Sequence, residues 1–209
     1  MSTDARWTAE DCYEISISGH LRQWRLFGEN LTWHRRISTG LGTDVLHIRD
    51  TVTNQGPTRW PHMMLYHVNV GYPLLDTGTT IEVLDHADAP EPRDPAAAAG
   101  LGEWSTFPAP APSFPEQVFR HELDPGGSGR VRVSNSALGL ALTIAADPTA
   151  LPWVFQWKSA AAGTYVLGVE PANCPTVDGR AAAREMGALP ELEPGQSQSY
   201  AIELSVDAG

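Results

Sequence analysis

The chain has 209 residues, a formal net charge of −11 and only two cysteines, Cys12 and Cys174. This length fits one large all-β domain and allows a sizeable core without disulfides or metals. The dispersed acidic residues argue against nucleic acids and anionic membrane surfaces as partners. The distant cysteines form no metal-ligand spacing, no apolar run is long enough to span a bilayer, and the N-terminal residues lack a secretory pattern. We therefore expect a cytoplasmic protein.

Short β-prone runs separated by Gly, Pro and Asn turns are the main secondary-structure signal. They predict a single antiparallel β-sandwich domain over residues 1–209. Strands are expected over residues 13–18, 43–53, 63–70, 80–84, 116–122, 130–134, 138–145, 152–158, 164–169 and 199–206. No long amphipathic helix is predicted, and only residues 94–101 and 179–187 are expected to form short helical turns.

Residues 85–115 form a long Pro/Ala-rich segment that interrupts the predicted strands. Long loops inside compact domains are usually functional covers or extended links. Trp104 and Phe107 lie within it, so we expect it to pack back onto the body. Whether it covers a site or is a surface segment without a chemical role stays open.

The first candidate site motif is the run PHMMLYHVNVGYPLL at residues 61–75. In a regular strand His67 and Asn69 point to one face and His62 to the other. A titratable ring beside a hydrogen-bonding amide suits a polar, neutral ligand such as a sugar. The commoner role for a histidine in such a pattern is structural, in the core.

The second motif is Gly163 to Asn173, in which Tyr165 to Val169 is predicted to form a strand. Glu170 would fall at the end of that strand, because Pro171 cannot donate a ladder hydrogen bond. Its carboxylate could then project into a cleft, and Asn173 could hold a loop or a substrate hydroxyl. The alternative is a surface acid on a hairpin.

Together the motifs supply an acid and a base for mutarotation. One group takes the proton from the anomeric hydroxyl while the other protonates the ring oxygen, and the opened sugar closes on its other face. This chemistry needs no metal, nucleotide or flavin, and we expect no cofactor. His62, His67 and Glu116 could gather as metal ligands, but their spacing matches no zinc motif.

The run PHMMLYHVNVGYPLL, the segment PEQVFRHEL and the C-terminal QWKSAAAGTYVLGVEPANCPTVDGR resemble the aldose 1-epimerase (galactose mutarotase-like) superfamily, in its domain-of-unknown-function branch. The resemblance extends from about Ile17 onward and implies a supersandwich of antiparallel sheets with a concave sugar site. It implies that His67 is the general acid and Glu170 the general base. Around them it implies substrate-binding residues, which are Asn69, Glu116, His121, Trp157, Lys158, Asn173 and Arg180.

Members of that branch extend further at the N-terminus, where they carry a second histidine beside a glycine and an arginine. Neither His20 nor His34 lies in a matching context. We therefore expect an N-terminally reduced sandwich with an exposed sheet edge, and homodimerisation through that edge is a hypothesis.

The leading functional hypothesis is an aldose 1-epimerase-like isomerase. A carbohydrate-binding protein without turnover and an acidic scaffold without ligand are the alternatives. Arg180, Lys158 and Arg184 hint at an anionic sugar, although surface arginines beside a loop are equally expected.

Overall fold

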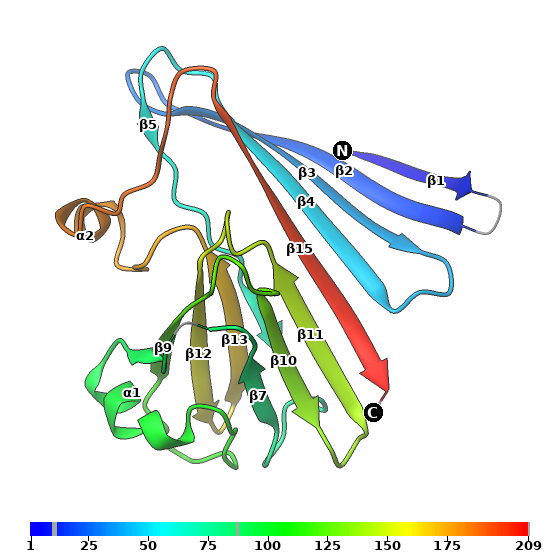
Figure 1. The fold of residues 1–209 in the computed structure, drawn as a ribbon, viewed down its shortest axis with the longest axis vertical. Helices are drawn as coiled ribbons and strands as arrows, with labels where there is room; N and C mark the ends of the chain where they lie inside the picture. Colours follow the sequence, from blue (N-terminus) through cyan, green and yellow to red (C-terminus); the bar gives the residue numbers. More distant parts are fainter. Residues whose placement is uncertain (10–11, 87, 209) are drawn as a thin grey trace. The chain divides into compact units, whose positions relative to one another are not determined.

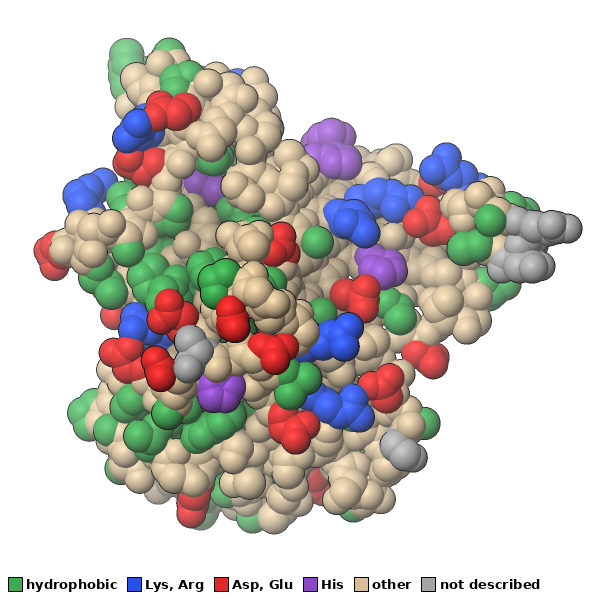
Figure 2. Space-filling model, viewed as in Figure 1, with side chains coloured by type: hydrophobic (Ala, Val, Ile, Leu, Met, Phe, Trp, Pro, Cys, Tyr) green, Lys and Arg blue, Asp and Glu red, His purple; other side chains and the backbone are tan. Residues whose placement is uncertain are grey.

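The computed structural model describes residues 1–9, 12–86 and 88–208, and its backbone is mainly antiparallel β-sheet (Figure 1). This confirms the all-β prediction. The chain forms two compact units, of which the first comprises Met1–Met63 and Thr176–Ser205 and the second Met64–Pro175 and Val206–Gly209. Acidic and basic side chains are interspersed over the face in view in Figure 2. None of the described helices has the length and hydropathy of a membrane span.

The first unit is built on long antiparallel strands that lie side by side in the order β1-β2-β3-β4-β15. Their bounds are β1 Ser2–Ala9, β2 Cys12–Trp24, β3 Asn30–Gly40, β4 Val45–Asn54 and β15 Ser197–Ala208. The short strands β5 (Trp60–Pro61) and β14 (Glu191–Leu192) pair with each other, and the helix α2 (Arg180–Glu185) belongs to the same unit. The expected helical turn at 179–187 is thus confirmed.

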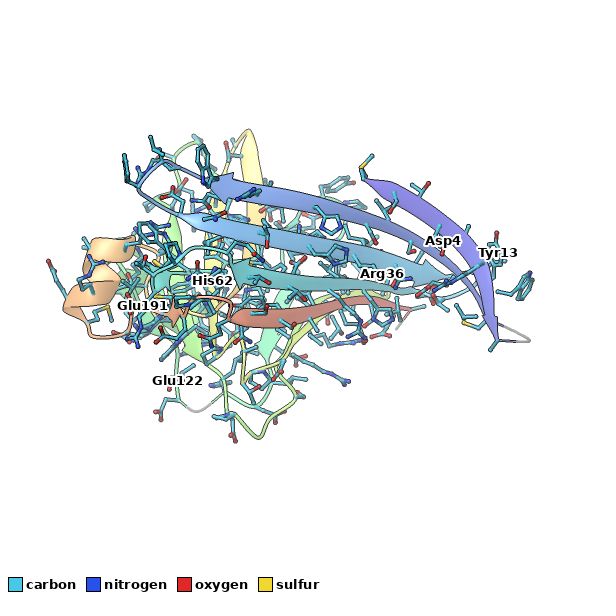
Figure 3. All side chains as sticks on the ribbon, turned by 90° about the horizontal axis from the view of Figure 1, so that it is seen from above. Asp4, Tyr13, Arg36, His62, Glu122 and Glu191 are labelled. Carbon is cyan, nitrogen blue, oxygen red and sulfur yellow. The ribbon has the colours of Figure 1, made fainter. Side chains whose placement is uncertain are left out.

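The register gives this sheet one apolar and one polar face. Ile17 lies opposite Ile37, which in turn lies opposite Ile48, so large apolar side chains share one face. The other face carries Asp4 on β1 and Arg36 on β3, and Arg36 pairs with a carboxylate of β2; Figure 3 labels both residues. This alternation is typical of a sheet that covers a core on one side.

The second unit contains two sheets. One has the strand order β7-β10-β11, with bounds β7 Thr80–Val83, β10 Arg130–Asn135 and β11 Leu140–Ala146. The other has the order β6-β13-β12-β9-β8, with bounds β6 Val68–Val70, β13 Thr164–Ala172, β12 Trp153–Ala161, β9 Gln117–Glu122 and β8 Glu91–Pro92. The helix α1 (Pro95–Ala99) and the 3-10 helix η1 (Leu101–Glu103) lie within the Pro/Ala-rich segment. Asp94 caps α1 through the backbone N–H of Ala97, which confirms the helical turn expected there.

Several strands differ from the sequence prediction: β2 continues to Trp24, and β1 and β3 were not predicted. Two further differences share one cause, which is Pro171. Strand β13 continues to Ala172, so Glu170 lies inside the strand rather than at its end, and the strand expected over 63–70 shortens to β6. The carbonyl of Pro171 accepts the N–H of Tyr66, at 2.9 Å. Because N–H and C=O of one residue point to the same side of a strand, the missing donor of Pro171 faces residue 66 and leaves the pairing with β12 intact.

Residues 103–107 of the Pro/Ala-rich segment are hydrogen-bonded to side chains of β12. The Nζ of Lys158, the only lysine of the chain, donates to the carbonyls of Glu103 and Thr106, each at 2.8 Å. The Nε2 of Gln156 donates to the carbonyl of Trp104 at 2.7 Å, and Phe107 is buried. The expectation that this segment packs back onto the body is confirmed.

Replacing Lys158 by Met should lower the free energy of unfolding by about 2 kcal/mol, because the two carbonyls lose the donor that the buried Lys158 gives them. Chemical denaturation measures this effect, and Arg130→Met on an exposed position of β10 is the matched control. The amine of Lys158 should also resist acylation in the folded protein. Rapid acylation under native conditions would contradict the described burial.

Acid should destabilise the protein through His121. Burial lowers the pKa of His121 from 6.5 to about 4, against an opposing hydrogen bond with Gln156. Its Nε2 lies 3.0 Å from the Gln156 Oε1, and its buried Nδ1 has no hydrogen-bond partner among the described residues. The proton that turns this ring into a cation is thus bound more weakly in the folded than in the unfolded chain.

Stability should therefore be retained above pH 6.5 and fall as the pH drops toward 4, by about 3 kcal/mol from this group. Denaturation of wild type and His121→Gln at neutral and acid pH measures it, and the variant should lose less stability on acidification. Equal losses in both proteins would assign the acid sensitivity to other groups, such as His62 of the first unit, whose pKa burial also lowers to about 4.

Candidate functional site

His67 and Glu170 form a direct pair on one face of the five-stranded sheet. The register between β13 and the segment before β6 is constant, with Leu65 opposite Ala172 and Val68 opposite Val169, which places His67 across from Glu170. The His67 Nε2 lies 3.1 Å from the Glu170 Oε1. The imidazole is 44% exposed and the carboxylate 9%, so the pair combines a buried acid with an accessible ring.

The space for this pair exists because residue 168 is glycine. Gly168 lies between Trp157 on β12 and Asn69 on β6 in one cross-strand row. A Cβ on Gly168 would come within 2.8 Å of the Glu170 Oε1, 3.1 Å of the His67 Cε1 and 3.2 Å of the Trp157 Cε3. The ring of Trp157 meets that of His67 edge-on, with centroids 5.7 Å apart. Gly168 is therefore surrounded on this face by Trp157, Asn69, His67 and Glu170.

The electrostatics of Glu170 suit a proton acceptor. Burial raises the pKa of its carboxyl, while the charges of His67 and Arg93 act in the opposite direction. The net direction is upward, toward the working pH that a general base requires. The contact with His67 also gives the carboxylate a neighbour with which it can exchange a proton.

Asn173 positions the segment that leads to His67. Its side-chain Oδ1 accepts the N–H of Met64 at 2.7 Å, and its backbone N–H donates to the Met64 carbonyl at 3.0 Å. The sequence suggested either a loop-holding or a hydroxyl-binding role, and the described contacts assign the first. Binding of a substrate by Asn173 stays a prediction.

His121 and Lys158 lie on the opposite face of the sheet from the pair, and substrate binding by either of them stays a prediction. The register places Trp157 on the face of Glu170, and alternation turns its neighbour Lys158 to the opposite face. His121, paired with Val154, has the same orientation as Lys158. Both are buried and hold partners inside the protein.

Glu116 and Arg180 are exposed residues outside the sheet. Glu116 precedes β9, and Arg180 begins α2 in the first unit. Among the described residues, neither contributes to the charges that act on Glu170. Their part in substrate binding stays a prediction.

Two cations that the sequence reading missed lie on the second unit near this face. Arg93 follows β8 and acts on Glu170 through its charge. Arg120 on β9 lies in the cross-strand row of Phe155 and Glu170, with its guanidinium 4.9 Å from the ring centroid of Trp153. Arg120 also donates to the Pro175 carbonyl at 2.8 Å. Only the register between β9, β12 and β13 could have assigned Arg120 to this face.

No group of three or more His, Cys, Asp or Glu side chains within the described ranges is arranged to hold a metal ion. His62 lies in the first unit and His67 in the second. His67 and Glu170 alone are two groups, fewer than the three counted for a metal site. The chemistry of the arrangement is that of a proton donor and acceptor in contact, on an accessible face beside an indole.

The substitution Gly168→Ala should displace the pair, because the added methyl group meets a carboxylate oxygen and two rings. We expect the Glu170–His67 contact to be lost with little loss of fold, which NMR chemical shifts of the His67 ring would report. Gly71→Ala is the matched control, since its Cβ meets nothing within 4 Å. An unchanged His67 spectrum in Gly168→Ala would contradict the described packing.

Comparison with solved structures identifies the fold. A candidate aldose 1-epimerase from Klebsiella pneumoniae matches with a TM-score of 0.89 at 22% identity, over 98% of this chain and 53% of that protein. A candidate aldose 1-epimerase from Escherichia coli K12 matches at 0.60 and 18% identity, over 100% of this chain and 69% of that one. A galactose mutarotase-like protein from Clostridium acetobutylicum matches at 0.61 and 13% identity, over 99% and 67%.

The chain thus spans about half the length of the Klebsiella protein. No curated protein matches the sequence significantly. The fold is of the galactose mutarotase-like type, as the sequence resemblance implied. A model of the family described as a domain of unknown function, DUF4432, matches residues 2–206, and the chain belongs to this family.

Proposed function

We propose that the protein is an aldose 1-epimerase-like isomerase that interconverts the anomers of a monosaccharide or sugar derivative. The observation that carries this proposal is the contact of the His67 Nε2 with the Glu170 Oε1, at 3.1 Å, on an accessible sheet face beside Trp157. The names of the solved neighbours, candidate aldose 1-epimerases and mutarotase-like proteins, support the same class of reaction.

The mechanism uses two oxygens that are bonded to the same carbon. The Glu170 carboxylate takes the proton of the anomeric hydroxyl, and the protonated His67 gives its proton to the ring oxygen as the bond from that oxygen to the anomeric carbon breaks. The aldehyde carbon then rotates. On closure the new ring forms as His67 recovers its proton from the attacking hydroxyl and the protonated Glu170 returns one to the carbonyl oxygen.

The close contact of the pair fits this reaction. Because both reacting oxygens lie on one carbon, neighbouring groups reach both. Positioned acid and base groups each contribute about a hundredfold to ten-thousandfold.

The surroundings of the pair support a sugar as substrate. Trp157 supplies an aromatic surface beside His67, and Asn69, an exposed amide in the same row, can orient hydroxyl groups. Arg93, whose charge reaches Glu170, would favour a sugar that carries an anionic group.

The second candidate function is carbohydrate binding without turnover. It is supported by Trp157 and Asn69, which offer an aromatic ring and an exposed amide to a sugar whether or not its anomers exchange. In that case the pair would bind hydroxyl groups without turning the sugar over.

Glu170→Gln should lower the rate of anomer exchange by about a hundredfold or more, because the amide cannot accept the anomeric proton. Polarimetry or NMR saturation exchange measures the rate with a panel of neutral and acidic aldoses. The matched control is Glu122→Gln, which alters an exposed carboxylate on β9 and should leave the rate unchanged.

His67→Ala separates the two candidates. Lost exchange with sugar binding retained supports the isomerase, whereas weakened binding of a sugar that the wild type never turns over supports the binding protein. If folded wild-type protein accelerates anomer exchange of no sugar in the panel, the proposed isomerase is wrong.

A further inference from the structure

One cross-strand row continues the candidate site from β13 across β12 and β9 toward β8 (Figure 1). Pro92 lies opposite Phe119, and the N–H of Arg93 donates to the Val118 carbonyl at 2.9 Å. This register puts Arg93 opposite Val118, which in turn lies opposite Trp157. Residues that lie opposite each other in antiparallel strands have their side chains on one face. Arg93 therefore belongs to the face of Trp157 and of the proposed acid–base pair.

Within this row Trp157 lies between Arg93 and the proposed acid–base pair. The row runs from Arg93 through Val118 and Trp157 to Gly168, against which the pair is packed. Neighbouring strands are about 4.8 Å apart, so the backbone of Arg93 is about 10 Å from that of Trp157 and about 14 Å from that of Gly168. Val118 between them is buried and short. A sugar ring that lies on Trp157 would thus have the pair at one end and Arg93 at the other.

The charge of Arg93 reaches the pair. Burial raises the pKa of Glu170, and the charges of His67 and Arg93 lower it. Because a general base needs a pKa near the working pH, this cation by itself works against the base. A ligand anion on the guanidinium would offset the charge of Arg93 and let the pKa of Glu170 rise once the ligand is bound. The cation therefore suits the binding of an anionic ligand better than the tuning of the free enzyme.

Arg120, on the same face, is directed elsewhere. It lies opposite Phe155, which stands on β12 midway between Trp153 and Trp157. Its guanidinium lies over the ring of Trp153, 4.9 Å from the centroid, and forms an ion pair with Glu91. The charge of Arg120 is thus balanced, and its side chain turns away from Trp157. Arg93 is the better candidate for a cation that meets a ligand on the indole.

We propose that the substrate is an aldose with an anionic group at its exocyclic carbon and that Arg93 binds this group, an inference that rests on the isomerase proposed above. The anomeric carbon then lies at the pair of His67 and Glu170, and the ring lies on Trp157. A guanidinium binds a carboxylate or a phosphate through two parallel hydrogen bonds. In a chain with a net charge of −11 such a substrate requires a cation in the site, because the protein otherwise repels it.

Anomer exchange of matched sugars tests this substrate class. D-glucose and D-galactose are each compared with the corresponding uronate and 6-phosphate, by NMR saturation exchange on the full chain. At least one anionic sugar should exceed its neutral parent in kcat/KM by about tenfold or more, because a hydrogen bond to a charged group contributes about that much. Arg93→Met should abolish this preference and leave the neutral sugars little changed. The uronates and the 6-phosphates distinguish a carboxylate from a phosphate as the group that is bound.

Arg130→Met, which removes the same charge from an exposed position on β10, is the matched control and should keep the preference. Exchange of neutral sugars as fast as of their anionic partners, or equal losses for both kinds in Arg93→Met, would overturn the proposal and leave the isomerase standing. If no sugar exchanges, the isomerase itself is wrong, and saturation-transfer binding of the same sugars still tests Arg93. Binding of an anionic sugar that Arg93→Met alone weakens supports the anion site, whereas equal or absent binding overturns it.

Discussion

The contact between His67 and Glu170 depends on one antiparallel register that is kept on both sides of Pro171. Leu65 lies opposite Ala172 and Val68 opposite Val169, so the residue across from Glu170 is fixed as His67. Pro171 offers its carbonyl to Tyr66 but has no N–H to return. The segment before β6 is therefore aligned with β13 without being a regular strand, and its histidine is accessible while its partner is buried.

Strand β12 serves two purposes on its two faces. Trp157 borders the candidate site, whereas its neighbours Gln156 and Lys158 point inward and donate to the carbonyls of Glu103, Trp104 and Thr106. These interior contacts hold β12 in place, and β12 carries Trp157 beside the candidate site. A rigid sheet beneath a buried carboxylate is the support that a positioned acid–base pair requires.

Alternation and turn residues predicted most strands, but they missed β1 and β3. In β3 the apolar positions Leu31, Trp33 and Ile37 alternate correctly, but Arg35 interrupts them because its partner Asp50 comes from β4. A charge balanced across strands cannot be recognised from one strand alone. The eight residues of β1 carry Trp7 as their only large apolar side chain, which is too weak a pattern to identify a strand.

His67 and Asn69 were singled out by their spacing of two residues and Glu170 by its place before Pro171, although His67 lies before β6 and Glu170 lies inside β13. That Lys158 and His121 lie on the opposite, buried face could not be predicted, because residue type does not reveal which face of a central strand is buried. Arg120 was missed for the same reason, since its face follows from the pairing of β9 with β12. The fold could thus be inferred from the sequence, while membership in the site required the register.

An NMR titration of the Glu170 carboxyl in wild type and in His67→Ala tests the acid–base pair most directly. We predict a pKa above the ordinary glutamate value in wild type, because burial raises it, and a further rise in the variant, because the opposing charge of His67 is gone. An ordinary pKa in wild type, or no change on removing His67, would contradict the claim that these residues form one acid–base pair.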